Sequence, residues 1–454
     1  MLPKISLLVL IVILGGALRF YNLSGRATFE WDQSRDHETV ASLINQKKPT
    51  LVGPVIQGQG GFMLGPLYYY LLIPTHLLMS GNPISQPLTS IIIDLTLIVA
   101  LFILGNRLSR PPTGLILAGL WCFSTYSISL SIVSWNVSLI PLYTLGSLSL
   151  GMQLTHHFRL RYFFLAVFWF GLAWHIHPSV IFQIPLALWL TRTNLRLFSP
   201  KTLSLALIVL VAPILPWLAF DLRHDFTNLR LLSDFFASSS LPGSLPKTLS
   251  SIWQKYAFEL SQLIFGRQLF FVGTILILAQ FIYLLFTTHF LSKFLKYNLL
   301  FSFLALILMR NPDFGNYYLL NILIINLYLL AQILASLPTH YRIFLFGLFL
   351  FINISQYRFA TQPFSLAIKS QVLEEIAAWK NPVDLEISLP VGRRSAFDWY
   401  LAHESTLDHQ DTAQDVAYIV ESDELEVTAP EKARSVVIEK TIGGFRFVGY
   451  EHNP

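Results

Sequence analysis

The feature that most constrains this chain is a series of long apolar segments separated by short connections. After an N-terminal run over residues 5–17, they cover residues 87–106, 113–133, 138–155, 162–177, 178–191, 202–220, 270–288, 297–309, 317–336 and 342–357. Of the 454 residues, 54% are hydrophobic and 13% charged, about half the charged share of a soluble chain. Compact cores bounded by water cannot hide so many apolar side chains. The composition excludes a disordered chain, a nucleic-acid-binding module and a water-soluble enzyme, and predicts a polytopic membrane protein.

The charges divide the chain near residue 357. Residues 1–357 hold 22 Lys and Arg against 10 Asp and Glu, a net charge of +12, whereas residues 358–454 hold 9 against 16, a net charge of −7. We therefore expect a mainly α-helical membrane domain over residues 1–357 and a small α/β domain over residues 358–454. Cys122 is the single cysteine, which excludes an internal disulfide and a thiol metal cluster.

Basic residues concentrate in connections that contain no acid, and the positive-inside rule assigns these to the cytoplasm. They are residues 107–110, 159–161, 192–201, 293–296 and 342. A first loop over residues 23–64, a long loop over 221–269, a third around 310–316 and the C-terminal domain then lie outside. Residues 65–79 reach only about 23 Å as a helix, so we expect a partial or interfacial helix there and about 11 to 13 spans in all. The N-terminal run has no small-residue cleavage site after it, which favours a retained span over a secretory signal.

The acids of the membrane domain gather in the predicted outer loops, and only Asp94 falls within a span. We expect Asp94 to be a hydrogen-bond partner in helix packing. In the first loop, Asp32 and Asp36 are four residues apart and would share one helix face with Arg35. On such a face one carboxylate can act as a base while the guanidinium receives a phosphate. The alternative is an interfacial amphipathic helix with the same charges.

Two other segments carry weaker signals. Residues 58–70 join a glycine-rich stretch, ending at Gly65, to a helix start with three tyrosines that include Tyr68; glycines let a backbone approach a ligand, and tyrosines suit a membrane interface. Residues 241–267 intersperse aromatic and polar side chains, which is typical of an interfacial helix covering the site. This helix would either contact the acceptor or pack on the surface.

Several of these motifs resemble glycosyltransferase family 39, a family of C-type membrane glycosyltransferases. Its relatives include protein O-mannosyltransferases and the aminoarabinose transferase of lipid A. The resemblance is carried by residues 32–36, 60–70, 134–136, 177 and 216–226, which also occur in the family's order. It implies a bundle of membrane helices whose active site lies on the outer face and is supplied by a polyprenyl-phosphate sugar.

The resemblance also assigns residues. The family's essential Asp and its Arg three positions later map onto Asp32 and Arg35, while Gln33 stands where many relatives have a second acid. That departure puts a divalent metal at this position in doubt, so we leave the metal unknown and no cofactor assigned. The pair of histidines around Ile176 also departs from the family's single His; His177 matches it, and His175 is either a second polar ligand or packing.

A phosphate-linked sugar is already activated, and the sequence has no phosphate-binding glycine fingerprint of a nucleotide enzyme. We expect Asp32 to be the general base of a single inverting displacement, with Asp36 as a second carboxylate that positions the acceptor or, alternatively, a metal. The candidates for the donor phosphate are Arg35, Arg223 and His224. The candidates for other substrate contacts are Gln33, Gly65, Tyr68, Asn136, His177 and Asp221.

In the C-terminal domain the patterns predict a helix over residues 371–379 and strands over 384–389, 417–420, 436–439 and 445–450. Residues 392–395, Gly-Arg-Arg-Ser, precede Trp399 and predict either a basic loop for an anionic acceptor or an ordinary solvated turn. His403 and His409 have no convincing metal spacing.

The function that these observations favour is transfer of a sugar from a polyprenyl-phosphate donor to a hydroxyl of a protein, lipid or glycan acceptor, with no nucleic-acid partner. We expect the enzyme to lie in the cytoplasmic membrane with its site and C-terminal domain outside. The alternative is a lipid or solute transporter or flippase without chemistry. A transporter of this size is expected to show internal repeats and charges near mid-membrane, and neither is evident in the sequence.

Overall fold

The computed structural model describes residues 2–56, 61–109, 111–156, 158–183, 199–238, 244–286, 290–309, 311–378, 383–403, 415–422 and 433–452. Outside these ranges lie some features discussed above: the glycines at 58 and 60, the basic residues at 110, 192, 196 and 310, the second half of the apolar segment 178–191, Trp379 and His409.

The described residues before Tyr357 form a bundle of α-helices with short 3₁₀ segments. Its α-helices in chain order are α1 (Leu2–Phe20), α2 (Leu23–Arg26), α3 (Trp31–Gln46), α4 (Leu67–Leu78), α5 (Ser85–Leu108), α6 (Thr113–Phe123), α7 (Thr125–Ile132), α8 (Ile140–His156), α9 (Leu160–Leu172), α11 (Pro200–Val211), α12 (Leu215–Arg223), α13 (Thr227–Ser238), α14 (Leu245–Phe265), α15 (Phe270–Phe286), α16 (Phe290–Met309), α17 (Leu320–Ser336) and α18 (Thr339–Gln356). The 3₁₀ segments are η1 (Asn136–Leu139), η2 (Ala173–His175), η3 (Pro178–Gln183), η5 (Ala212–Ile214) and η6 (Asn316–Leu319).

Four helical segments are long and apolar enough to cross a membrane, and two bent pairs raise this to six among the described residues. The four are Ser85–Leu108, Asn136–Leu154, Pro200–Arg223 and Asn316–Ser336. The number of 11 to 13 spans stays a prediction. The segment predicted as one span over residues 113–133 consists of two helices, α6 and α7, with a bend of 61° between them. The bend lies at Ser124, which is extended and whose hydroxyl donates to Leu263 O at 2.6 Å.

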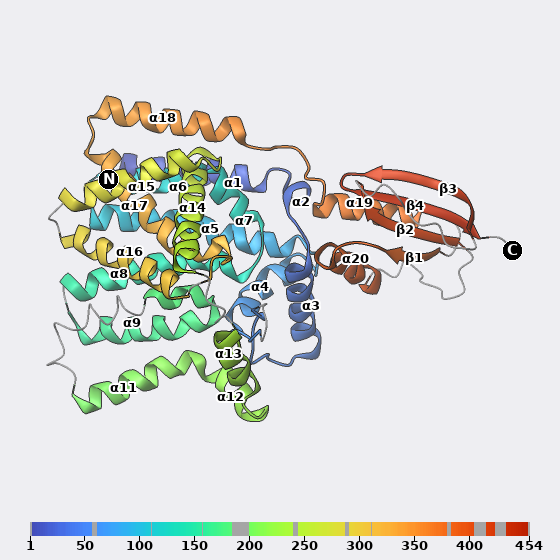
Figure 1. Cartoon of the computed structure of the whole chain (residues 1–454), viewed down its shortest axis with the longest axis horizontal. Helices are drawn as coiled ribbons and strands as arrows, with labels where there is room; N and C mark the ends of the chain where they lie inside the picture. Colours follow the sequence, from blue (N-terminus) through green and yellow to red (C-terminus); the bar gives the residue numbers. More distant parts are fainter. Residues whose placement is uncertain are drawn as a thin grey trace.

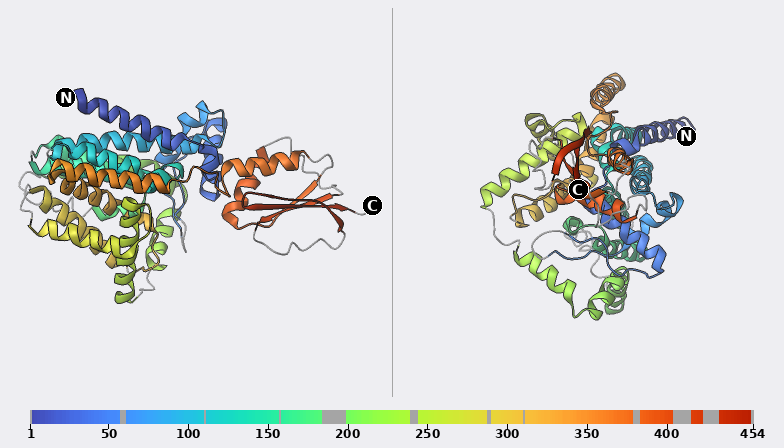
Figure 2. Two further views of the ribbon diagram at one scale, coloured as in Figure 1. Left: turned by 90° about the horizontal axis from the view of Figure 1, so that it is seen from above. Right: turned by 90° about the vertical axis from the view of Figure 1, so that its right-hand side faces the viewer.

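The long helices run side by side, and α14 crosses them (Figure 1); it meets α15 at 92°. The N-terminus lies at the end of the bundle opposite to α2 and α3, and the C-terminal unit extends from the end that carries α2 and α3 (Figures 1 and 2). The segment predicted as a partial helix is α4, which is only 12 residues long.

Asp94 is confirmed as a packing residue. It forms a buried ion pair with Arg19 of α1, whose Nε donates to its Oδ2 at 2.7 Å, and its Oδ1 accepts from Trp121 Nε1 at 2.7 Å. Arg19 also donates to Cys122 O at 3.0 Å. Because an unpaired charge inside such a bundle is costly, these bonds fix α1, α5 and α6 to one another.

The C-terminal unit is a four-stranded sheet with two helices. Its elements are α19 (Leu366–Ala377), β1 (Val383–Ile387), α20 (Val391–His403), β2 (Asp415–Glu421), β3 (Ala433–Ile442) and β4 (Phe445–His452). The strand order is β1-β2-β4-β3, with β1 and β2 parallel and the other pairs antiparallel. All four predicted strands are present. Its core includes Phe29 of the first loop, and the domain division between residues 357 and 358 stays a prediction.

One local prediction in this unit is wrong. Residues 392–395 are neither a loop nor a solvated turn but part of α20, which begins directly after Pro390. Arg393 pairs with Glu421 of β2, and its guanidinium lies 3.4 Å from the centre of the Phe364 ring. These partners are distant in sequence, which is why the local pattern did not reveal the helix.

Candidate active site

The site is built on α3, whose start is fixed by Gln33. The Gln33 Oε1 accepts the backbone N–H of Glu30 at 3.0 Å, which satisfies a donor that the helix cannot. The predicted helix is therefore present and begins at Trp31, directly before Asp32. Asp32, Arg35 and Asp36 come to lie together, as their spacing predicts.

Arg35 lies between the two carboxylates. Its Nη1 is 2.9 Å from Asp32 Oδ1, and its Nε and Nη2 donate to Asp36 Oδ1 at 2.8 and 2.6 Å. The Asp32 side chain is 41% exposed and that of Asp36 is 1% exposed. Burial raises the pKa of Asp36 to about 7, although the Arg35 guanidinium partly offsets this. Asp32 is thus the carboxylate that a substrate can reach, and Asp36 is the inner anchor of Arg35.

This cluster does not fit a divalent metal as it stands. Among the described residues no three His, Cys, Asp or Glu side chains are grouped as a metal site would require. A cation shared by Asp32 and Asp36 would need the space that the Arg35 guanidinium fills. The alternative role of Asp36 as a metal ligand therefore has no support in the geometry.

Ser134 links α3 to α4 and α5, because it forms hydrogen bonds with side chains of all three helices. Its carbonyl accepts from Gln33 Nε2 at 2.8 Å, and its hydroxyl lies 2.9 Å from the Tyr68 hydroxyl and 3.3 Å from that of Ser90. Both ends of the Gln33 amide thus bind backbone groups. Sequence reasoning named Gln33 and Tyr68 but missed Ser134 as their common partner; the only signal was its place in the motif 134–136.

Asn136 connects η1 to the backbone beside His177, since its Nδ2 donates to Ile176 O at 2.6 Å. His177 follows and is buried; its Nδ1 accepts the backbone N–H of Ser179 at 3.1 Å. Its Nε2 has no hydrogen-bond partner among the described residues. The ring packs edge-on against both Tyr317 and Tyr318, at centroid distances of 4.9 and 5.0 Å.

Tyr317 connects this region to Asp32 and was not predicted. Its ring packs edge-on against Trp135 at 5.5 Å, and its phenol lies within electrostatic range of the Asp32 carboxylate. The structure thus brings Asp32, Tyr317 and His177 into one continuous region from three remote parts of the sequence. The available signal was the pair of tyrosines directly after the outer connection at residues 310–316.

Gly65 and His175 form a structural contact beside this region. The Gly65 N–H donates to Trp174 O at 3.1 Å, and His175 Nδ1 accepts from Leu67 N at 3.3 Å while its Nε2 lies 2.6 Å from Pro213 O. Both ring nitrogens of His175 are therefore used within the protein. Of the two alternatives for His175, the geometry supports packing.

Replacing Gly65 by Ala is expected to destabilise the protein by about 1–3 kcal/mol, because the added methyl group would overlap the His175 ring. The measurement is thermal unfolding of the detergent-solubilised protein. Gly347→Ala on α18 is the matched control, since a Cβ there meets nothing within 4 Å. An equal melting temperature for Gly65→Ala and Gly347→Ala would contradict the close approach.

The predicted residues of the long loop lie apart from the α3 cluster. Asp221 is buried, and its two carboxylate oxygens accept from Asn228 N and Leu229 N at 2.8 and 3.0 Å, so it stabilises the first turn of α13. Arg223 and His224 are exposed at the end of α12, and His224 stacks on Phe220 at 4.1 Å. Within the described part of the chain, none of these three contacts Asp32, Arg35 or Asp36.

Comparison with known proteins supports a specific fold. No family model matches the sequence, and no curated protein matches it significantly. ArnT from Cupriavidus metallidurans in the apo state superposes with a TM-score of 0.62 at 13% identity, and ArnT bound to undecaprenyl phosphate with 0.59 at 12% identity; each match covers 97% of both chains. The apo oligosaccharyltransferase of Archaeoglobus fulgidus gives 0.53 at 14% identity over 88% of this chain and 64% of that one. The chain has the C-type glycosyltransferase fold.

In this fold the segment that leads into α3 is hydrogen-bonded to residues of the C-terminal part of the chain. Gln362 N donates to Gly25 O at 2.7 Å and Leu366 N to Ala27 O at 2.9 Å. The buried Lys369 donates from Nζ to Phe29 O. Burial lowers the pKa of Lys369 to about 8, although the carboxylate of Glu30 partly offsets this. The position of Asp32 therefore depends on the C-terminal unit, a coupling that no local sequence pattern indicated.

Proposed function

We propose that this protein is a membrane glycosyltransferase that moves a sugar from a polyprenyl-phosphate donor to an acceptor hydroxyl. One observation carries the proposal: a half-exposed carboxylate, Asp32, is held beside a guanidinium in a fold that matches ArnT over 97% of both chains. The ArnT structure bound to undecaprenyl phosphate supports a lipid-phosphate donor. The site and the C-terminal unit would lie on the outer face of the cytoplasmic membrane, consistent with the acid-free basic connections.

In this mechanism Asp32 takes the proton of the acceptor hydroxyl while that oxygen attacks the anomeric carbon. The new C–O bond forms on the face opposite to the phosphate. The bond from the anomeric carbon to the phosphate oxygen breaks, and its electron pair leaves on that oxygen as polyprenyl phosphate departs. Configuration at the anomeric carbon is thereby inverted. Asp36 holds Arg35, and Arg35 in turn orients Asp32.

The departing phosphate needs cationic partners. Arg223 is exposed, and its guanidinium has no ion-pair partner within the described residues, so it and His224 remain our candidates. Arg35 is already shared by two carboxylates, so it would contact the phosphate only by exchanging one of them. Gln33, Tyr68 and Asn136 are assigned to holding the site in shape rather than to direct contact. His177 remains a candidate for substrate contact, because its Nδ1 is used by Ser179 while its Nε2 has no hydrogen-bond partner among the described residues.

The test is transfer of radiolabelled sugar by the purified protein in lipid vesicles. The donors are undecaprenyl-phosphate-linked sugars, and the acceptors are the lipid, glycan and protein fractions of cells that lack the gene. We expect label to appear in one acceptor fraction and polyprenyl phosphate to be released in equal amount. Movement of labelled donor across the bilayer without transfer would instead support the transporter.

The transfer rate is expected to rise with pH through about 7, because that is the pKa of Asp36. Below it Asp36 is neutral, so Arg35 is no longer shared by two carboxylates and its charge acts mainly on Asp32, which opposes proton transfer from the acceptor. Rates measured from pH 5.5 to 8.5 should lose this inflection in Asp36→Asn. The stability of the fold should change with pH in the opposite direction. Folding raises the pKa of Asp36 from its ordinary 3.8 to about 7, so the protonated carboxyl favours the folded state. This contribution to the free energy of unfolding is lost as the pH rises through about 7.

A further inference from the structure

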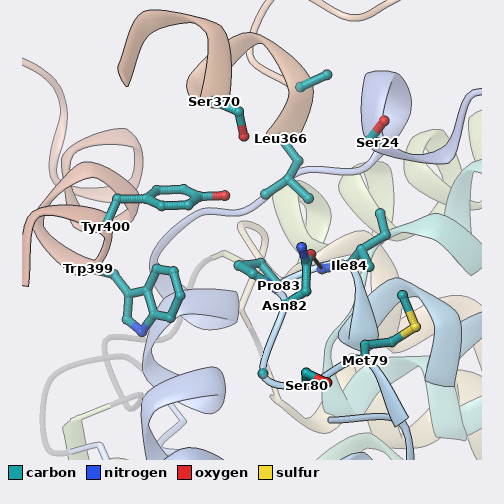
Figure 3. A pocket seen from close by; sticks show the side chains of 12 residues that line it. Ser24, Met79, Ser80, Asn82, Pro83, Ile84, Leu366, Ser370, Trp399 and Tyr400 are labelled. Atoms are coloured by element: carbon teal, nitrogen blue, oxygen red, sulfur yellow. Dashed lines mark hydrogen bonds between the residues drawn. The ribbon is translucent and has the colours of Figure 1, made fainter. Parts of the chain in front are cut away.

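A cavity of about 660 Å³ lies where the C-terminal unit meets the bundle. Its walls come from α2, the turn between α4 and α5, α19 and α20 (Figure 3). The side chains that form it are uncharged. They include Ser24, Ser80, Asn82, Ser370, Trp399 and Tyr400.

The chemistry of this lining selects a class of ligand. The volume is in the range of small-molecule sites, about 300–1,000 Å³. Two aromatic side chains of α20, Trp399 and Tyr400, lie across the cavity from Pro83, Asn82 and Leu366 (Figure 3). The hydroxyl and amide groups of the lining alternate with apolar side chains, and none of the described lining residues carries a charge. A phosphate or carboxylate would find no cation here. A neutral sugar can lay a C–H face on the half-buried Trp399 ring and hydrogen-bond through its hydroxyls to the polar groups, which include the edge of the largely buried Tyr400.

The cavity shares a wall with the candidate active site. The turn between α4 and α5 is tied to α3, since Gly81 O lies 2.8 Å from His37 Nε2. The Trp399 ring packs edge-on against the same histidine at 4.8 Å. His37 is five residues after Asp32, about 7.5 Å along the helix axis. A ligand in the cavity therefore lies close to the catalytic face of α3 but on another side of the helix.

We propose that this cavity binds a neutral saccharide unit of the acceptor, remote from the hydroxyl that receives the sugar. The binding of a neutral saccharide stands on the cavity itself, and only its assignment to the acceptor rests on the proposed function. The proposal narrows the acceptor from protein, lipid or glycan to a molecule that already carries neutral sugar.

The test is saturation-transfer NMR on the full-length protein in nanodiscs. The probes are neutral trisaccharides of glucose, mannose, galactose and N-acetylglucosamine, with trigalacturonate as the charged comparison. We expect at least one neutral probe to receive saturation and trigalacturonate to receive none. Absence of saturation for every neutral probe, or equal saturation for trigalacturonate, overturns the proposal.

Variants on α19 locate the binding. Ser370→Trp fills the cavity and should raise Kd about tenfold or more, and Ser370→Ala, which only removes a hydroxyl, should raise it by about 2- to 10-fold. Gln371→Trp is the matched control, because this neighbouring side chain is exposed and does not line the cavity. Unchanged binding in both Ser370 variants contradicts the location.

A transfer assay separates the two proposals. Ser370→Trp should raise the KM for the acceptor and leave kcat unchanged. A protein that binds neutral sugar through Ser370 but transfers none would refute the proposed function while the saccharide site remains. A transferase whose acceptor KM is unaffected by Ser370→Trp would refute the assignment to the acceptor.

Discussion

Asp32→Asn is expected to lower the turnover of sugar transfer by roughly 100- to 10,000-fold, the usual contribution of a general base. The amide has nearly the same shape as the carboxylate but cannot take the acceptor's proton. Because Asp32 is half-exposed and, in the part of the chain that the structure describes, forms an ion pair with Arg35 alone, its replacement should leave the fold intact. Initial rates in vesicles, with the melting temperature measured in parallel, check both statements.

Glu38→Gln is the matched control for this experiment. Glu38 lies on the same helix, is exposed, and has no ion-pair partner among the described residues. The substitution removes one negative charge from α3 without changing Asp32, Arg35 or Asp36, so near-normal turnover is expected. If folded Asp32→Asn also retained near-normal turnover, Asp32 would not be the base and another group, with His177 the first to test, would have to take the proton.

The local part of this site was predictable because it depends on spacing within one helix. Asp32, Arg35 and Asp36 lie together since residues three and four apart share a face. Asp94 was also predictable, because an acid inside an apolar span requires a partner. In both cases the residue types and the helical periodicity were sufficient to predict the contact.

The remainder depends on contacts between segments far apart in the chain. Gln33 binds the carbonyl of Ser134, 101 residues away, and Lys369 binds that of Phe29, 340 residues away. A substrate role was predicted for Asp221, whereas the structure shows it capping the first turn of α13. Backbone carbonyls and amides are present at every residue, so the sequence does not indicate which of them a polar side chain will meet.

Arg35→Gln is expected to destabilise the protein by about 3–5 kcal/mol at pH 8, because it leaves the ionised Asp36 buried without its counter-charge. The loss should be smaller at pH 6, where Asp36, with a pKa of about 7 even beside Arg35, is already mostly protonated. Thermal unfolding at the two pH values measures the difference.

The double variant Arg35→Gln/Asp36→Asn distinguishes a charge effect from a packing effect. If the cost arises from the buried unpaired carboxylate, the second change should restore most of the stability, giving a non-additive cycle with a coupling of about 3 kcal/mol. Transfer activity should not be restored, since Asp32 then lacks the guanidinium that orients it. Additive losses of stability would mean that Arg35 stabilises α3 through packing. Recovery of transfer would mean that Asp32 needs no orienting partner. Either result would show that Arg35 does not couple the stability of α3 to catalysis.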